Sequence, residues 1–175
     1  MLGVSDYGAF VLAFILLLFL PGPGNLALVH ATGLGGLRGG LASIAGLLLG
    51  DQVLMWLTVA GVAALLQSLP ALFAVLQGLG AAYLAWMGWR MWWPKAGGAA
   101  PVRVRPGRYF LDTLMITLLN PKAVMFYFAF FPQFIDPQAH QGLITFGFMA
   151  LTVALLGGAY CTGVVCLTHG MARRL

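Results

Sequence analysis

The sequence predicts an all-α, polytopic membrane protein, a bundle of about five transmembrane helices. Of the 175 residues, 61% are hydrophobic and only 7% are charged, whereas about a quarter of the residues of a soluble domain are charged. A helix needs about 20 apolar residues to cross a bilayer. The stretches that meet this length are residues 7–33, 39–66, 72–93, 109–134 and 143–167. This composition excludes an ordinary soluble globule, and the net charge of +5 gives no reason to expect a nucleic-acid partner.

The first span is interrupted near its middle by the run Pro21, Gly22, Pro23, Gly24 and Asn25. Proline removes a backbone donor and clashes with the preceding turn, and in lipid such a defect is tolerated only where protein or a cavity surrounds it. We expect a second half-helix to begin within this run, with its N-terminus facing a central cavity. The run is therefore predicted to bind substrate and to flex.

The second span carries Gly46 and Gly50, a pair of small residues whose spacing lets two helix backbones approach closely. Asp51 follows, near the middle of the span, and is the only acid that we assign to the interior of a span. Asp51 is predicted to hold a substrate ammonium group or to carry a coupling proton; the structural alternative is an ion pair with Lys122. Gln52, its neighbour, is included in the predicted binding site.

The third span ends in a cluster of tryptophans beside Arg90 and Lys95, a pattern typical of an interfacial aromatic belt. Residues 94–107 follow as a linker that is rich in proline, glycine and basic residues, and we expect it to be flexible.

The fourth span contains the second interruption, Asn120, Pro121 and Lys122. Asparagine is a favoured N-cap and proline a favoured first helical residue, so a half-helix is predicted to begin here inside the membrane. Its dipole and the lysine charge suit a carboxylate. The alternative is a kinked helix whose lysine snorkels or pairs with an acid. Phe126 and Tyr127 are predicted to line a pocket for the substrate side chain.

The fifth span carries Cys161 and Cys166, which point about 140° apart on a helix. We expect these cysteines to be packing residues, with no disulfide and no metal site.

The positions of the basic residues predict the topology. With five spans, the connections that carry arginine all fall on one side, and the positive-inside rule makes that side cytoplasmic. The N-terminus is then outside and the C-terminus inside. The chain divides into a first repeat at 1–93, the cytoplasmic linker at 94–107 and a second repeat at 108–175. Three spans in the first half place the second half in an inverted orientation, in which a sixth span is lacking.

The motifs in their order resemble the LysE/RhtB amino-acid exporters, and most closely the leucine-efflux-like members. The segments that carry the resemblance are residues 21–23, 50–54, 78–88, 119–123 and 131–136. The resemblance implies a 3+3 inverted repeat of the LysE type with the sixth helix missing. It also implies efflux of leucine or other small or apolar amino acids across the bacterial inner membrane, by proton-coupled alternating access. Many members carry Asn or Asp where this chain has Gly24.

Several alternatives stay open from the sequence. One is an ion or metal exporter of the same superfamily, although clustered metal ligands are not evident, and another is a truncated membrane protein that does not transport. An intramembrane enzyme is not predicted because its catalytic motifs are missing. The expected partners are an amino-acid substrate, protons and the lipid bilayer; no cofactor is expected, and a homo-oligomer is compatible with the sequence.

Overall fold

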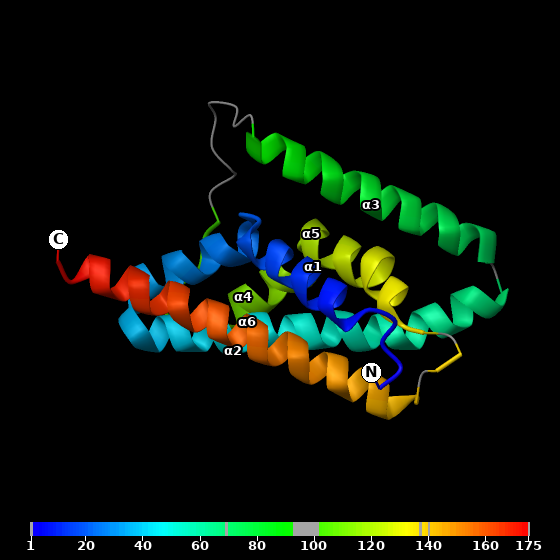
Figure 1. The fold of residues 1–175 in the computed structure, drawn as a ribbon. Coiled ribbons are helices and arrows are strands. Elements are labelled where there is room, and N and C mark those ends of the chain that lie inside the picture. Colours follow the sequence, from blue (N-terminus) through cyan, green and yellow to red (C-terminus); the bar gives the residue numbers. More distant parts are fainter. Residues whose placement is uncertain (1, 69, 93–101, 137, 140, 175) are drawn as a thin grey trace.

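The computed structural model describes residues 2–68, 70–92, 102–136, 138–139 and 141–174. These parts are helical, and their only extended pairing is an isolated antiparallel bridge between Val4 and Ile135. Figure 1 shows long helices that run roughly along one direction of an elongated bundle. The predicted all-α fold is confirmed.

The first helix ends where the proline-rich run begins. Helix α1 (Tyr7–Phe19) starts at Asp6, whose carboxylate accepts a hydrogen bond from the Ala9 amide at 2.9 Å. Helix α2 (Pro23–Ser68) starts again after a gap of Leu20, Pro21 and Gly22. The interruption of the predicted first span is therefore present.

Helix α2 is a hairpin of two arms that meet at Gly36, where φ is +59° and ψ is −149°. Glycine adopts this left-handed conformation without the steric cost of a Cβ atom. In Figure 1 the first arm of α2, drawn in a lighter blue than α1, runs from the centre to the left end, and the cyan arm returns from there. The turn falls between residues 33 and 39, where the sequence predicts the connection between the first two spans.

Helix α3 (Pro70–Trp92) lies to one side of the other helices in Figure 1. It approaches the bundle at Gly80, which contacts Ala129 so closely that a Cβ atom at Gly80 would overlap the Ala129 side chain. Trp86 and Trp89 are 51% and 65% exposed, and their place in an interfacial aromatic belt stays a prediction. Lys95 and the first part of the linker lie outside the described residues, as does the side chain of Arg90.

The fourth predicted span is also interrupted. Helix α4 (Tyr109–Leu118) ends before Asn120, and the chain continues as α5 (Pro121–Met125), the π-helical turn η1 (Phe126–Phe130) and the 3₁₀ turn η2 (Phe131–Phe134). The axes before and after the break differ by 49°. Helix α4 packs on the second arm of α2, with Phe110 against Gly46 and Thr117 against Gly50. The predicted packing role of these two glycines is therefore observed.

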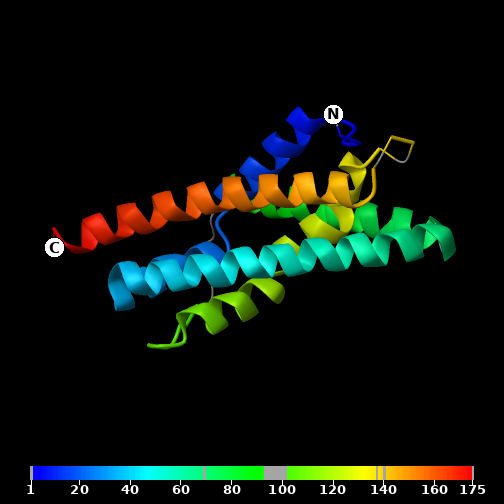
Figure 2. The ribbon, with the colours of Figure 1, turned by 90° about the horizontal axis from the view of Figure 1, so that it is seen from below.

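Helix α6 (Leu143–Ala172) completes the described structure and lies along α2, as Figure 2 shows from a second direction. By length and composition, two helical stretches of the described structure can cross a membrane: Pro23–Gly61, which includes the turn at Gly36, and Leu143–Ala172. The bent pair formed by α4 and Pro121–Phe134 makes up to three. The count of five spans and the inverted repeat stay predictions.

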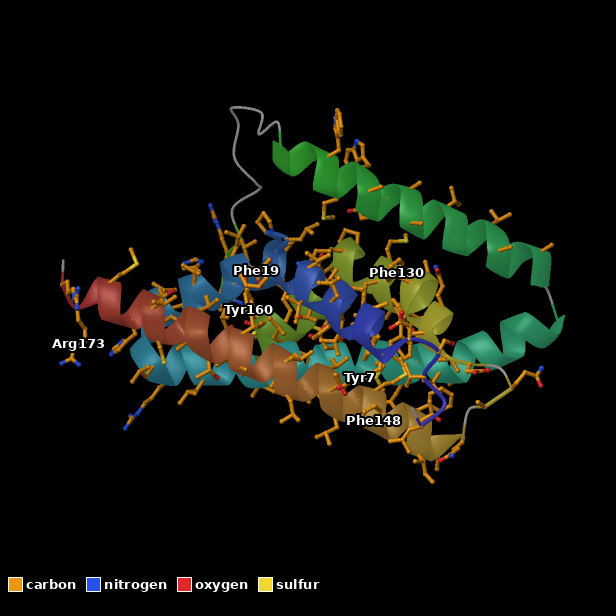
Figure 3. All side chains as sticks on the ribbon, viewed as in Figure 1. Tyr7, Phe19, Phe130, Phe148, Tyr160 and Arg173 are labelled. Carbon is orange, nitrogen blue, oxygen red and sulfur yellow. The ribbon has the colours of Figure 1, made fainter. Side chains whose placement is uncertain are left out.

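The basic segments gather at one end of the bundle. The turn of α2, the start of α4 and the C-terminus lie together at the left of Figures 1 and 2, and Arg173 marks this end in Figure 3. The N-terminus lies at the opposite end, where the Ser5 amide donates to the Phe134 carbonyl oxygen at 2.9 Å. The charge separation expected from the sequence is therefore present in space, whereas the cytoplasmic assignment stays a prediction.

The described part of the linker is docked on the bundle, which differs from the flexibility expected of it. Val104 is 3% exposed and packs in a small apolar cluster with Ala27 and Ala31. Arg105 donates two side-chain hydrogen bonds to Asp112 in the first turn of α4, at 3.0 and 2.6 Å. These bonds raise the pKa of the Arg105 guanidinium above its ordinary value. Asp112 is a second buried acid within a predicted span, so the prediction that Asp51 is the only one is wrong.

Candidate functional site

The open end of α1 is satisfied by side chains from elsewhere in the fold. The last carbonyl groups of a helix lack partners within the helix, and the prolines that follow α1 provide no replacement donors. Lys122 donates from Nζ to the carbonyl oxygens of Leu17 at 3.0 Å and Leu20 at 2.7 Å. Asn25 donates from Nδ2 to the Leu18 carbonyl oxygen at 2.9 Å. The two interruptions therefore meet, and Lys122 joins them.

The start of α5 has the local chemistry that the sequence predicts. The Asn120 side chain accepts a hydrogen bond from the Lys122 amide at 3.1 Å, and Pro121 occupies the first helical position. This cap directs the Lys122 side chain toward the first interruption. A Cβ atom at Gly22 would lie 3.3 Å from both Cε and Nζ of Lys122, so glycine at this position leaves room for the ammonium group.

A small cavity lies between the two interruptions. Its volume is about 40 Å³, enough for about two or three water-sized groups, whereas small-molecule sites usually measure about 300–1,000 Å³. Its lining comes from α1, both arms of α2, α4, α5 and α6, and comprises Phe14, Leu17, Leu18, Gly24, Asn25, Leu47, Asp51, Thr117, Asn120, Lys122, Ala123 and Cys161. Five of the residues predicted for the site, Gly24, Asn25, Asp51, Asn120 and Lys122, are thereby brought together.

Asp51 and Lys122 are both 7% exposed and line the same cavity. Their charges are close enough to attract each other. No ion pair within 4.0 Å joins them, however, because the ion pairs of the described residues all join arginines to Asp112. The direct pair considered from the sequence is therefore not formed here. A buried carboxylate and a buried ammonium group face one cavity, and the ammonium group is bound to neutral carbonyl oxygens.

Two hydroxyl groups near Asp51 make no hydrogen bond of regular geometry in the described structure: Oγ1 of Thr117 and the phenol of Tyr127. Thr117 is 3% exposed and Tyr127 is fully buried. The Tyr127 hydroxyl lies beside the Asp51 carboxylate, whereas Tyr127 itself is not part of the cavity lining. Tyr127 is among the residues predicted from the sequence, whereas Thr117 is not, because its only signal is a polar residue in the last turn before the second interruption.

Tyr160 of α6 was also missed. Its hydroxyl lies 3.1 Å from Asn25 Nδ2, which donates a hydrogen bond to it. Its ring meets Phe19 edge to face, with centroids 5.3 Å apart. Figure 3 shows Phe19 and Tyr160 next to each other where α1 ends. Helix α6 thereby helps to hold the first interruption in place.

The remaining predicted residues lie outside the cavity lining. Gln52 donates to the Ala150 carbonyl oxygen of α6 at 3.1 Å, and Phe126 packs on Phe14 with ring centroids 5.8 Å apart. Pro21 and Pro23 are exposed, while Gly22 and Pro121 flank the lysine contact. A direct role of these residues with substrate stays a prediction.

Cys161 is buried and Cys166 is exposed, and both are free thiols. No group of three or more metal-ligating side chains occurs within the described parts of the chain.

Comparison with known proteins identifies the family. The family model described as LysE type translocator matches residues 15–175. The chain is 38% identical over 172 residues to a leucine efflux protein of Enterobacter sp. (strain 638), a match that covers 93% of this chain and 79% of that protein. It is 36% identical over 168 residues to a leucine efflux protein of Klebsiella pneumoniae, again covering 93% and 79%.

An uncharacterized membrane protein of Pseudomonas aeruginosa is 36% identical over 173 residues, covering 94% of this chain and 80% of that protein. No solved structure matches the chain. The extent of the family match and the identity to these relatives show that the chain belongs to the family of LysE type translocators.

Proposed function

We propose that the chain exports amino acids, leucine or other small apolar ones, across the inner membrane of a bacterium. Relatives that are 38% and 36% identical are named leucine efflux proteins. The observation that carries the proposal is that Asp51 and Lys122, buried and of opposite charge, line one cavity without pairing with each other. A free amino acid has two charges of opposite sign, and this arrangement offers one partner for each.

In the proposed complex, the substrate carboxylate binds Lys122 and the first amides of α2 at Gly24 and Asn25. An ammonium group has three N–H donors, and Lys122 donates two of them to carbonyl oxygens of α1. A carboxylate is a stronger acceptor than a carbonyl oxygen, so substrate competes with α1 for the lysine. The substrate ammonium group faces Asp51.

The substrate side chain requires a larger space than the cavity of about 40 Å³ provides. In this proposal the described conformation is a closed one, and the halves move about the interruptions to open the site toward each side in turn. Transfer of Lys122 from the α1 carbonyl oxygens to the substrate carboxylate loosens the contact between the halves. Substrate binding thereby promotes the movement.

We further propose that Asp51 carries the coupling proton and that the end with the arginine-rich segments is cytoplasmic. A protonated Asp51 no longer attracts an ammonium group, so proton binding from outside favours release of the substrate there. Return of the empty, protonated carrier completes an exchange of one substrate for protons.

Efflux from preloaded cells tests the proposal. Cells that express the chain are loaded with radiolabelled leucine, and its loss is compared with cells that carry an empty vector. We expect faster loss that a protonophore abolishes, and a return to the vector rate for Asp51→Asn at equal membrane abundance. Equal loss from wild-type and vector cells for leucine, isoleucine, valine and alanine would contradict the proposal, and an unimpaired Asp51→Asn would contradict the role of Asp51.

A further inference from the structure

We propose that Thr117 and Tyr127 complete, with Asp51, a subsite of three oxygen acceptors for the primary ammonium group of the substrate. The inference rests on the proposed function and adds to it the residues that select a primary amine. A primary ammonium group has three N–H donors, and one carboxylate group alone leaves part of them unsatisfied once water is removed.

Thr117 behaves unlike the other buried helical threonines of this chain. Thr32, Thr58 and Thr152 each donate from Oγ1 to the carbonyl oxygen four residues earlier, at 2.7, 2.8 and 2.9 Å, which is the usual way to satisfy such a hydroxyl. Thr117 is 3% exposed and has no partner. Its hydroxyl is therefore available to a ligand in the cavity that it lines.

The position of Thr117 beside Asp51 follows from the packing of α4 on α2. A Cβ atom at Gly50 would lie 2.8 Å from both Cβ and Cγ2 of Thr117, so only glycine allows this approach. The methyl side of Thr117 thereby rests on the residue that precedes Asp51. Both side chains line the same cavity.

Tyr127 is also unlike the two other tyrosines that make hydrogen bonds within the described bundle. Tyr7 bonds to Thr152 at 3.2 Å and Tyr160 to Asn25 at 3.1 Å. The fully buried Tyr127 hydroxyl instead has the Asp51 carboxylate as its polar neighbour, without a hydrogen bond of regular geometry. It lies in the π-helical turn η1 (Phe126–Phe130), an irregularity frequent at functional sites.

Buried polar groups are almost always hydrogen-bonded, so the unpartnered Thr117 hydroxyl in the lining of this cavity is a specific observation. The Tyr127 hydroxyl faces Asp51 from just outside that lining and supports it. The cavity of about 40 Å³ is large enough for an ammonium head group in the closed conformation. Lys122, in the same lining, disfavours a bare cation but suits a zwitterion whose carboxylate faces it. Water alone in this position is the competing interpretation, and the experiment distinguishes it.

The experiment measures uptake of radiolabelled leucine by everted membrane vesicles from cells that express the full chain. The variants are Thr117→Val and Tyr127→Phe, which remove a hydroxyl and keep the shape. The matched control is Thr58→Val, because the buried Thr58 hydroxyl bonds to its own helix. Competitors are isopentylamine, which has only the ammonium group, 4-methylpentanoate, which has only the carboxylate, and N-methyl-leucine.

We expect each site variant to raise the half-saturating leucine concentration by about tenfold or more, a change that corresponds to about 1.4 kcal/mol. Inhibition by isopentylamine weakens in parallel, whereas inhibition by 4-methylpentanoate is unchanged. N-methyl-leucine, with fewer donors, competes poorly with wild type and loses this disadvantage in the variants. The thermal stability of the purified site variants equals or exceeds that of wild type, whereas Thr58→Val is less stable with unchanged half-saturation.

Unchanged half-saturation in both site variants would overturn the inference and favour bound water at these hydroxyls. Equal weakening of the amine and carboxylate competitors would also overturn it, because the hydroxyls would then act through the fold. Absence of leucine uptake by wild-type vesicles would refute the proposed function itself, and the inference with it. The wild-type measurement thus tests the function and the variants test the subsite.

Discussion

Replacement of Lys122 by methionine removes the contact that joins the two interruptions while keeping most of the side-chain volume. The ammonium group donates two hydrogen bonds to carbonyl oxygens of α1, at 3.0 and 2.7 Å. A hydrogen bond that involves a charged group contributes about 1.5–3 kcal/mol, so the two together contribute about 3–6 kcal/mol. Burial of a lysine in the bilayer costs about 2.5–3.5 kcal/mol. With the middle of each range, about 4.5 kcal/mol against about 3 kcal/mol, the predicted net loss for Lys122→Met is about 1.5 kcal/mol.

Thermal unfolding of the purified protein in detergent measures this loss. A thiol-reactive fluorescent dye reports unfolding through Cys161, which is fully buried, in a Cys166→Ser background that removes the exposed thiol. For a chain of this length, 1 kcal/mol shifts the midpoint by about 2–4 °C, so we expect a fall of about 5 °C. The control is Arg173→Met, which removes an exposed charge and leaves the midpoint unchanged. A Lys122→Met midpoint equal to or above that of wild type would refute the reasoning, because the lysine would then not stabilise the end of α1.

Three further predictions follow from the packing and capping of the helices. Gly46→Ala places a methyl group against the Phe110 carbonyl oxygen, so we expect the free energy of unfolding to fall by about 1–3 kcal/mol in the same assay. The control Gly33→Ala, with open space around it, stays within about 0.5 kcal/mol of wild type. Equal midpoints for the two variants would show that α4 does not approach α2 so closely. Asn120→Ala removes the cap of α5 and lowers the free energy of unfolding by about 1 kcal/mol, whereas Asn120→Asp keeps an acceptor and loses less. Equal losses for the two variants would mean that Asn120 does not stabilise the fold through this cap. Asp112→Ala releases Arg105, so we expect trypsin to cleave the linker of the purified protein faster. The control Asp136→Ala leaves the cleavage rate unchanged. An unchanged rate for Asp112→Ala would mean that residues 102–108 are held by Val104 and its apolar neighbours alone.

The two interruptions could be predicted because their causes are local. Proline lacks a donor wherever it stands, and asparagine before proline is a helix start whatever surrounds it, so the observed ends of α1 and α4 follow from a few adjacent residues. The packing role of Gly46 and Gly50 is equally local, since their spacing places both on one helix face.

The use of Lys122 could not be predicted, because its partners are carbonyl groups about 100 positions earlier in the chain. Carbonyl groups occur in every residue, so no sequence pattern marks those of Leu17 and Leu20 as acceptors. The sequence suggests a carboxylate, an acidic side chain or the membrane surface as the partner of this lysine, and none of these is a backbone carbonyl group. Thr117 and Tyr160 were missed for a related reason: a single hydroxyl has no signature until the fold places it beside an interruption.

The packing of residues 102–108 on the bundle does not follow from their composition, because one residue among them is buried. Proline, glycine and arginine indicate a solvated connection, yet Val104 is 3% exposed and the bidentate contact between Arg105 and Asp112 holds the chain against α4. Both partners of that contact lie on the basic end of the bundle, where arginines were interpreted only as topology signals.

The most direct test of the central claim is leucine transport by the purified 175-residue chain in proteoliposomes with an imposed pH gradient. We predict accumulation of radiolabelled leucine that reverses with the gradient, collapses with a protonophore and is absent in Asp51→Asn, while Asp136→Asn transports as wild type does. Equal accumulation by Asp51→Asn and wild type, or no gradient-driven movement of any small apolar amino acid by correctly reconstituted protein, would contradict the proposal that Asp51 and Lys122 form the site of a proton-coupled exporter.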